Sequence, residues 1–344
     1  MKMKCIFTVI AFMACSNVAS LYAKTTSDLS YIKSIFETPV TDSRPGVYWY
    51  FMDGNISKEG ITKDLESMKK AGIGSVVFLE VNVGVPRGNV DLLSPEWKAC
   101  FKHAVEECER LDISMVLGIG PGWNGSGGPW VKAEESMRHV VSSSTNVHGK
   151  GLQHIFLKKP LPKAPFFGKG SLTPEIEKKW MDYYEDVLVL AFPASKELEV
   201  LKDADDKALY YRAPYSSSPV AKQYVVREKS QSDASCNNVI SRNEIHDITK
   251  YLKGDTLIWK VPEGDWTIMR FGLRNNGAVT RPAPFPGLGF ESDKTDKVAL
   301  HHHQDNFTNV LLSCLGQRDT TLTGGLKGLH IDSWEMGSQN WSPY

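Results

Sequence analysis

An acidic motif around residue 335 has the residue types needed for acid–base catalysis. The apolar segment Gly328-Leu-His-Ile-Asp332 is typical of a short strand, and it leads directly into Ser333-Trp-Glu335. Barrel enzymes keep their catalytic groups at the carboxyl ends of such strands. A carboxyl group desolvated beside an indole ring is suited to general-acid chemistry, so we interpret Glu335 as a catalytic acid. The alternative is a surface glutamate at a strand-to-loop corner.

Asp332 in the same motif is a candidate for substrate binding. Asp332 and Glu335 have opposite parity along an extended chain, so a regular strand would direct their side chains to opposite faces. Both side chains can reach one pocket only if the strand ends near Trp334.

A glycine-rich segment, Pro121-Gly-Trp-Asn-Gly-Ser-Gly-Gly-Pro-Trp130, is a candidate substrate loop. Glycine permits positive φ angles and close backbone approach, and the two indoles can stack on a sugar ring. Trp123, Asn124 and Trp130 are therefore expected to contact substrate. A flexible turn with two packed tryptophans is an equal alternative. A phosphate-binding loop is disfavoured, because the segment lacks the Gly-Lys-Ser/Thr ending of a P-loop.

Three more polar candidates for substrate binding follow predicted strands. Asp53 and Asn55 come directly after the apolar run Val47–Phe51, and Glu80 follows the run Ser75–Leu79. If these strands are parallel, their carboxyl ends lie at one edge of the sheet, where the loops of barrel enzymes form the active site.

Helices are expected between the strands. Ser57 is a plausible N-cap for a helix that ends at Gly72, and Ser94-Pro95 begins a second helix before a third strand at Ile113–Leu117. Strand–helix alternation predicts parallel pairing with right-handed crossovers. A dinucleotide site has no support, because no G-x-G-x-x-G motif opens a helix after the first strand. The apolar stripes are Ile61, Leu65 and Met68 in the first helix, and Trp97, Phe101, Ala104, Cys108 and Leu111 in the second.

The order of elements predicts an α/β fold, a partial (β/α)8 TIM-type barrel with an inserted all-β, sandwich-like domain. Alternation alone also fits an open doubly wound sheet, but the polar and aromatic residues after the strands favour the barrel. We expect residues 24–140 to form the first part of the barrel, residues 141–285 the insert, and residues 286–344 the barrel continuation.

The expected elements of the last two parts are less regular. In the insert, Asp186–Phe192 is a predicted strand, and Thr256–Val261 with Trp266–Phe271 reads as a hairpin. Residues 293–315 are expected to form one helix. Its expected apolar face comprises Leu300, His303, Phe307, Val310 and Cys314.

Residues 1–23 have the pattern of an export signal. Lys2 and Lys4 precede a short apolar run, with acceptable cleavage after Ser20 or Ala23. An imperfect lipoprotein signal is the alternative, with a lipid anchor at Cys15. The apolar run is too short for a transmembrane helix, so we expect the protein in the periplasm or at the cell surface.

The composition argues against a nucleic-acid partner. Lysine plus arginine and aspartate plus glutamate each number 40, so the formal net charge is zero. The remaining cysteines, Cys100, Cys108, Cys236 and Cys314, are expected to be free thiols. Adjacent residues of a helix point about 100° apart, so His301–His303 cannot converge on one metal ion, and His303 is expected to be a core histidine.

The ordered set of motifs resembles glycoside hydrolase family 106, the calcium-dependent α-L-rhamnosidases of bacterial polysaccharide degradation. The resemblance covers residues 44–344. It is carried by Tyr48-Trp-Tyr-Phe-Met-Asp-Gly-Asn-Ile-Ser57 with Gly60-Ile-Thr-Lys-Asp-Leu65, by Leu93-Ser-Pro-Glu-Trp97, by Pro121–Trp130, by Gly289-Phe-Glu-Ser-Asp-Lys294 and by Ile331-Asp-Ser-Trp-Glu-Met-Gly-Ser-Gln-Asn-Trp341.

The resemblance implies an inverting hydrolase of rhamnose-containing oligosaccharides or polysaccharides. Glu335 would be the general acid, and a second glutamate well downstream would activate water. Calcium is implied without assignable ligands, Asp332 being only a guess. Family members are much longer, and four barrel strands are expected here where closure needs eight, so we expect a fragment. The alternatives are an inactive or sugar-binding remnant and a barrel glycosidase of other sugar specificity.

Overall fold

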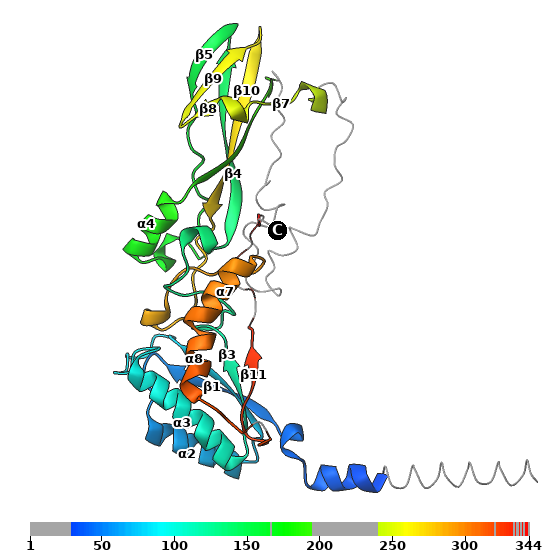
Figure 1. Ribbon diagram of the computed structural model, residues 1–344, viewed down its shortest axis with the longest axis vertical. Helices are drawn as coiled ribbons and strands as arrows, with labels where there is room; N and C mark the ends of the chain where they lie inside the picture. The colour runs from blue at the N-terminus through cyan, green and yellow to red at the C-terminus, as the bar shows by residue number, and fades with distance from the viewer. Residues whose placement is uncertain are drawn as a thin grey trace, which may run out of the picture.

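The computed structural model describes residues 29–165, 167–194, 240–319 and 321–332, together with residues 334, 337, 339, 341 and 342. The expected signal segment 1–23, with Cys15, lies outside the described residues, as do Cys236 and Glu335. Figure 1 shows two antiparallel sheets at one end of an elongated molecule and a parallel sheet with its helices toward the other.

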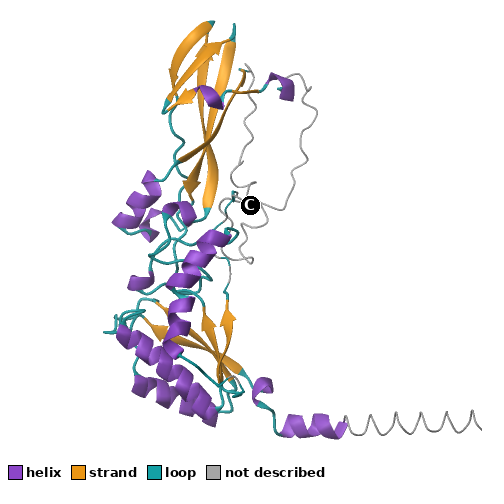
Figure 2. Ribbon diagram, in the orientation of Figure 1, coloured by secondary structure: helices purple, strands orange, loops and turns teal. Residues whose placement is uncertain are grey.

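The parallel sheet has four strands in the order β1-β2-β3-β11, and its first three strands match the predicted positions. One face of the sheet is covered by helices (Figure 2). Two of these helices connect β1 to β2 and β2 to β3, as the predicted alternation requires. The elements are β1 (Gly46–Met52), α2 (Lys58–Lys70), β2 (Ser75–Val81), α3 (Pro95–Leu111), β3 (Ser114–Gly118) and β11 (Gly325–His330).

Both predicted helix N-caps are confirmed. The Ser57 hydroxyl accepts a hydrogen bond from the Gly60 amide at 3.1 Å, and the Ser94 hydroxyl accepts one from the Trp97 amide at 3.1 Å. Each bond satisfies an amide that has no partner inside the helix. Pro95 occupies the first turn of α3, where a missing N–H costs nothing.

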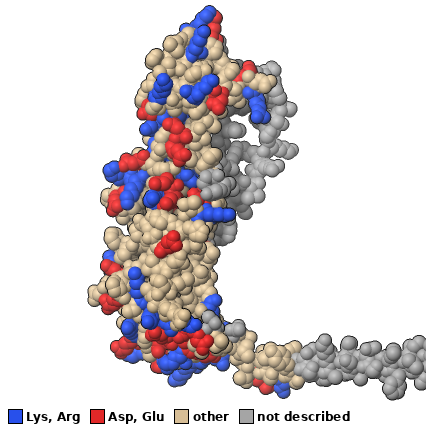
Figure 3. Space-filling view, in the orientation of Figure 1, with Lys and Arg blue, Asp and Glu red and all other residues tan. Residues whose placement is uncertain are grey.

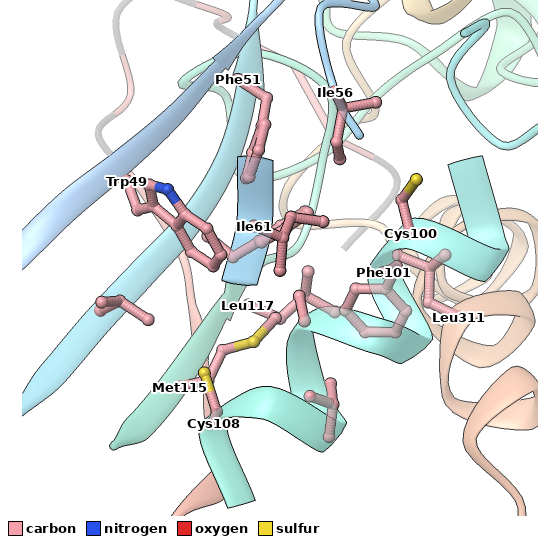
Figure 4. Close-up of a cluster of buried hydrophobic side chains, with 14 of the residues drawn as sticks. Trp49, Phe51, Ile56, Ile61, Cys100, Phe101, Cys108, Met115, Leu117 and Leu311 are labelled. Carbon is pink, nitrogen blue, oxygen red and sulfur yellow. The ribbon is translucent and has the colours of Figure 1, made fainter. Parts of the chain in front are cut away.

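The main hydrophobic core lies between the sheet and its helices. In Figure 4, Ile61 of α2, Phe101 and Cys108 of α3, and Met115 and Leu117 of β3 point into one cluster. All five side chains are at most 1% exposed. The predicted apolar stripes of both helices therefore face the sheet.

The sheet curves strongly on the face opposite the helices. Tyr48 of β1 and His330 of β11 lie on the two edge strands, yet their rings are 5.8 Å apart. A flat sheet would hold these strands about 14 Å apart, with side chains roughly perpendicular to it. The described residues thus form a curved parallel sheet, and a closed barrel is not observed in them.

The insert contains a two-sheet sandwich. One sheet has the order β4-β10-β6-β7 and the other the order β5-β9-β8, and both are antiparallel. Residues such as Trp259, Trp266 and Ile268 are buried between them. The strands are β4 (Arg138–His148), β5 (Gly151–Phe156), β6 (Glu185–Pro193), β7 (His246–Asp247), β8 (Leu252–Lys253), β9 (Thr256–Val261) and β10 (Asp265–Asn275).

The predicted hairpin of the insert is wrong. Strands β9 and β10 belong to different sheets: β9 pairs with β5 and β8, and β10 pairs with β4 and β6. Trp259 and Trp266 meet edge to face across the sandwich, with centroids 5.6 Å apart. Burial of the apolar side chains of both strands between the sheets outweighs local pairing across the short turn.

The insert was expected to be all-β, but it also contains a helix. Helix α4 (Pro174–Asp182) lies within it, capped by the Thr173 hydroxyl, which accepts from the Ile176 amide at 3.3 Å. Ile176 and Trp180 bury one face of this helix. The Thr173-Pro174 pair is an ordinary helix start that the prediction missed.

The expected single helix over 293–315 is two helices, α7 (Lys297–Asn306) and α8 (Thr308–Leu315). Asp296 caps α7, and Phe307 leaves the helical conformation, with φ −123° and ψ −74°. The expected apolar face is only partly correct, because this break shifts the stripe. The buried positions are Ala299, His303, Phe307, Thr308, Leu311 and Leu315.

Free thiols are confirmed for the cysteines that the structure describes. Cys100 and Cys108 are buried, and Cys314 is half-buried. Burial raises the pKa of the Cys108 thiol to about 12, so this thiol stays protonated and unreactive at neutral pH.

Removing the Phe101 ring is expected to destabilise the protein strongly. Phe101 is fully buried and packs against Phe78 and Trp97, with centroids 5.7 and 6.0 Å away. Phe101→Ala should lower the free energy of unfolding by about 3–5 kcal/mol, measured by urea denaturation. Lys102→Ala, exposed on the same helix, should change it by less than about 0.5 kcal/mol. Equal effects of the two substitutions would contradict this packing.

Candidate active site

Four loops meet at the carboxyl edge of the parallel sheet. The Asp53 amide donates to the Val81 carbonyl at 2.9 Å, and the Gly122 amide donates to the Glu80 carbonyl at 2.9 Å. The Ile119 amide donates to the His330 carbonyl at 3.1 Å. These bonds link the chain after β1, β2, β3 and β11, so the loops that carry the predicted site residues share one edge.

Asp332 lies beside the glycine-rich loop. Its carboxylate is 3.3 Å from the Nε2 atom of His330. A Cβ added to Gly125 would come within 2.6 Å of the Ile331 side chain and 3.6 Å of the Asp332 amide. Glycine at this position therefore allows the loop to pack directly on the chain that leaves β11.

Tyr50 also belongs to this cluster. Burial and the neighbouring Tyr48 and Asp332 raise the pKa of the Tyr50 phenol, and the nearby Trp123 side chain acts against that shift. Two predicted residues, Trp123 and Asp332, are thus brought together around a tyrosine from β1.

Tyr50 and His330 were missed by the sequence analysis. The alternation of β1 contains the signal for Tyr50, because Trp49 and Phe51 are buried against the helices and Tyr50 must face the opposite side. His330 follows from the same rule only once β11 is placed beside β3.

Glu335 lies outside the described residues, so its side chain is not placed. Its neighbour Trp334 is described, and the Lys294 ammonium lies 5.1 Å from the centre of the indole ring. Lys294 is itself paired with Glu291, a carboxylate only 1% exposed. An ion pair between a half-buried lysine and a buried glutamate therefore lies next to the acidic motif, in a segment to which the sequence assigned no role.

A second set of bonds holds the chain after the motif. The Gln339 amide donates to the Asp293 carboxylate at 2.8 Å, and Arg138 contacts the same carboxylate at 3.4 Å. Arg138 also forms a backbone bridge with Trp341. Residues on both sides of Glu335 are thus attached to the segment around Asp293.

Glu80 is a buried carboxylate with an unusual protonation equilibrium. One oxygen accepts from the Gly54 amide at 2.8 Å and the other from the Trp97 indole. The side chain is only 4% exposed. Burial raises its pKa to about 7, although both hydrogen bonds oppose that shift. Glu80 therefore ties the loop after β1 to helix α3.

Asp53 and Asn55 are used by their own loop. Asp53 has a positive φ of 43° and accepts from the Phe285 amide at 3.4 Å. The Asn55 amide donates to the Met52 and Pro86 carbonyls, at 2.7 and 2.9 Å. These contacts shape the loop at the edge of the site.

Asn124 and Trp130 are held in different ways. Asn124 is 2% exposed; its amide donates to the Val279 carbonyl at 3.3 Å, and its Oδ1 atom has no partner among the described residues. Trp130 packs against His303 and Phe307, with centroids 5.8 and 6.1 Å away. The geometry of Trp130 agrees with the alternative of a packed tryptophan.

Calcium remains an expectation from the resemblance, and its ligands are not assigned among the residues that the structure describes. No group of three or more His, Cys, Asp or Glu side chains converges among them. Asp293, the most buried carboxylate near the motif, already accepts from the Thr295 amide and hydroxyl as well as from Gln339 and Arg138.

The surface shown in Figure 3 has no region of a single charge sign. Side chains of both signs are mixed over α2 and α3 and around the sandwich, and the band between them carries few. None of the helices in the described part of the chain is long and apolar enough to cross a bilayer.

The family model described as alpha-L-rhamnosidase, of glycoside hydrolase family 106, matches residues 37–344. The chain belongs to this family. It is 33% identical over 317 residues to a putative beta-glucuronidase of Formosa agariphila. Its fold is similar to that of a rhamnosidase from Novosphingobium sp. PP1Y, with a TM-score of 0.66 and 24% identity over 90% of this chain. The family 106 chain spans 25% of the first relative and 40% of the second.

Glu80 should make the stability of this family 106 chain fall as the pH rises. Its pKa is about 7 in the folded chain against an ordinary 4.5, so folding retains a proton between these values. The stabilisation is complete below pH 4.5 and is lost as the pH rises through 7. Between pH 5 and 8 this group should lower the free energy of unfolding by roughly 2–3 kcal/mol.

Urea denaturation at the two pH values measures this effect. Glu80→Gln, which cannot ionise, should remove the pH dependence that Glu80 contributes. It should also lower the free energy of unfolding by a constant amount at both pH values, because the amide nitrogen of glutamine cannot accept one of the two hydrogen bonds. Glu96→Gln, an exposed substitution in the first turn of α3, should leave the dependence unchanged. An unchanged dependence in Glu80→Gln would exclude Glu80 as its source.

Proposed function

We propose that the protein hydrolyses α-L-rhamnosidic bonds in oligosaccharides or polysaccharides by an inverting mechanism, with Glu335 as the general acid. One observation carries the proposal: the loop bearing Trp123 packs directly on Ile331 and Asp332, immediately before the Trp334-Glu335 pair. Family membership supports the reaction class.

The proposed chemistry uses two carboxyl groups. Glu335 protonates the glycosidic oxygen as the bond to the anomeric carbon breaks, and a water molecule attacks the opposite face of the sugar. A base removes the proton from that water; the resemblance places this base in a second glutamate well downstream of Glu335. Inversion requires the two carboxyl groups to lie roughly 6.5–9.5 Å apart, so that the water fits between them.

The described residues have proposed roles in holding the sugar. Trp123 offers an aromatic face for the apolar side of the ring. Asp332 accepts hydrogen bonds from sugar hydroxyls, and Tyr50 donates or accepts one beside it. Neutral rhamnose requires no countercharge, which agrees with the mixed surface.

We also propose that β1, β2, β3 and β11 are four consecutive strands of a (β/α)8 barrel. The support is the curvature that brings Tyr48 and His330 within 5.8 Å across the sheet. Export to the periplasm or cell surface, with a lipid anchor at Cys15 as one form of it, is likewise a proposal from the N-terminal pattern.

A second candidate is hydrolysis of another glycoside, favoured by the name of the Formosa agariphila relative, a putative beta-glucuronidase. A glucuronide carries a carboxylate, for which Lys294, 5.1 Å from the centre of the Trp334 ring, is a described cation beside the acidic motif. Lys294 is already paired with Glu291, and this pairing favours a neutral sugar. A sugar-binding remnant without turnover is the third candidate.

A substrate comparison tests the proposal. The protein produced from its complete gene should release p-nitrophenol from p-nitrophenyl α-L-rhamnoside and not from the β-glucuronide. Cleavage of the glucuronide alone would support the second candidate. Binding of rhamnose by calorimetry without release from either glycoside would support the remnant.

Glu335→Gln tests the role of the acid. A general acid typically accelerates a reaction by roughly 10²–10⁴-fold, and this acceleration is needed most when the leaving group is a poor one. The variant should therefore lose turnover of a rhamnosyl disaccharide by at least about 100-fold and retain far more activity on 2,4-dinitrophenyl rhamnoside. Glu134→Gln, an exposed glutamate, serves as the control. Equal losses on both substrates would remove Glu335 from the acid role.

A further inference from the structure

His303 of α7 lies between the two ends of the glycine-rich loop. Its Nε2 atom is 2.6 Å from the Ile119 carbonyl oxygen. Its Nδ1 atom is 3.1 Å from the Gly127 amide nitrogen and 3.2 Å from the Trp130 indole nitrogen. One side chain thus contacts the first residue after β3 and two residues at the far end of the loop.

These contacts fix the protonation state of the ring. Amide and indole N–H groups can only donate, so Nδ1 must carry a lone pair. The Ile119 carbonyl can only accept, so Nε2 must carry the proton. In the neutral Nε2–H tautomer, Nε2 donates to the Ile119 carbonyl, and the Gly127 and Trp130 N–H groups share the Nδ1 lone pair. Neither the Nδ1–H tautomer nor the protonated ring can accept from those two groups.

The surroundings hold the ring in this place. His303 is 1% exposed and stacks on Phe307 at 6.0 Å with an interplanar angle of 10°. Gly127 has φ +123°, and a Cβ there would approach the Phe290 carbonyl oxygen to 2.7 Å. The loop backbone can therefore reach the imidazole only because residue 127 is glycine.

The charges around His303 also oppose its protonation. Burial is the largest cause of the lowered pKa of His303, and the nearby Lys294 and His302 lower it further. The loop residues 119–130 contain no ionisable side chain. Glu291 and Glu135, two carboxylates on the adjoining segments, are paired with Lys294 and His302.

We infer that His303 is a positioning residue: as a neutral Nε2–H imidazole it closes the loop Ile119–Trp130 into the shape that presents Trp123 beside Asp332. Its effect on turnover rests on the proposed function, whereas its effect on loop structure does not. Protonation at Nδ1 would set a third N–H against those of Gly127 and Trp130, so acid releases the far end of the loop.

The direction of the pH effect follows from the lowered pKa. The unfolded chain takes up a proton on this histidine near pH 6.5, and the folded chain does so only at lower pH. The contribution of His303 to stability is therefore complete above pH 6.5 and is lost as the pH falls through the folded value.

Nuclear magnetic resonance of the ¹⁵N-labelled chain tests the inference without any need for activity. At pH 7.5 the His303 ring should give the spectrum of the neutral Nε2–H tautomer, and the Gly127 amide should exchange slowly with solvent. His303→Gln should accelerate that exchange by about tenfold or more, with the protection of α2 and α3 retained. His301→Gln, exposed on the same helix, should leave the Gly127 amide protected.

The outcomes separate the inference from the proposed function. A protonated ring or an Nδ1–H tautomer at pH 7.5 in the wild-type chain would overturn the inference, and so would unchanged Gly127 exchange in a folded His303→Gln variant. If that variant does not fold, the tautomer and the pH at which wild-type Gly127 loses protection remain decisive. In the complete gene product, His303→Gln should raise KM for the rhamnoside and shift the pH at which activity falls on the acid side of the profile. Absence of wild-type rhamnosidase activity would overturn only the proposed function.

Discussion

Strand β11 pairs with β3 in parallel from Gly325 to His330, although the whole sandwich lies between them in the sequence. This pairing returns the chain to the sheet and brings Asp332 to the same edge as the loop after β3. Parallel strands share the direction of their carboxyl ends, so one ladder is enough to bring Asp332 to the glycine-rich loop. Without the pairing of β11 with β3, the two parts of the candidate site would not be brought together.

Buried polar groups then give the loops their shape. Glu80 holds the loop after β1 through Gly54 and Trp97, and His303 holds both ends of the loop after β3. A buried group of this kind is costly when a partner is missing, so each fixes one loop conformation rather than many. The two groups respond to pH in opposite directions, since Glu80 stabilises most in acid and His303 above pH 6.5.

Local patterns predicted the parallel sheet well. Ser57 and Ser94 marked the helix starts, and the apolar stripes of the two helices marked the faces that now pack on the sheet. These signals depend on neighbouring residues only, so sequence spacing is enough to read them. The same holds for His303, whose position on an apolar helix face indicated a core histidine.

Long-range pairing was not predictable in the same way. The short turn between β9 and β10 resembled that of a hairpin. Instead, β9 pairs with β5 and β10 with β4 in separate sheets, because this pairing buries the apolar side chains of both strands in the core of the sandwich. The same limit applies to the site. Tyr50 on β1 lies near Trp123 and Asp332 only because the sheet curves, and so does the β1 side chain that contacts His330. Glu80 was predicted at the site, but its burial against Trp97 could not be read from the strand alone.

The central claim is that a sugar site lies where the glycine-rich loop meets the Asp332–Glu335 motif. A crystal structure of the complete gene product with bound L-rhamnose tests it most directly. The sugar ring should lie against Trp123, with its hydroxyl groups hydrogen-bonded to Asp332 and the Glu335 carboxyl group facing the anomeric centre. Rhamnose bound elsewhere, with Glu335 turned into bulk solvent away from Trp123 and Asn124, would contradict it.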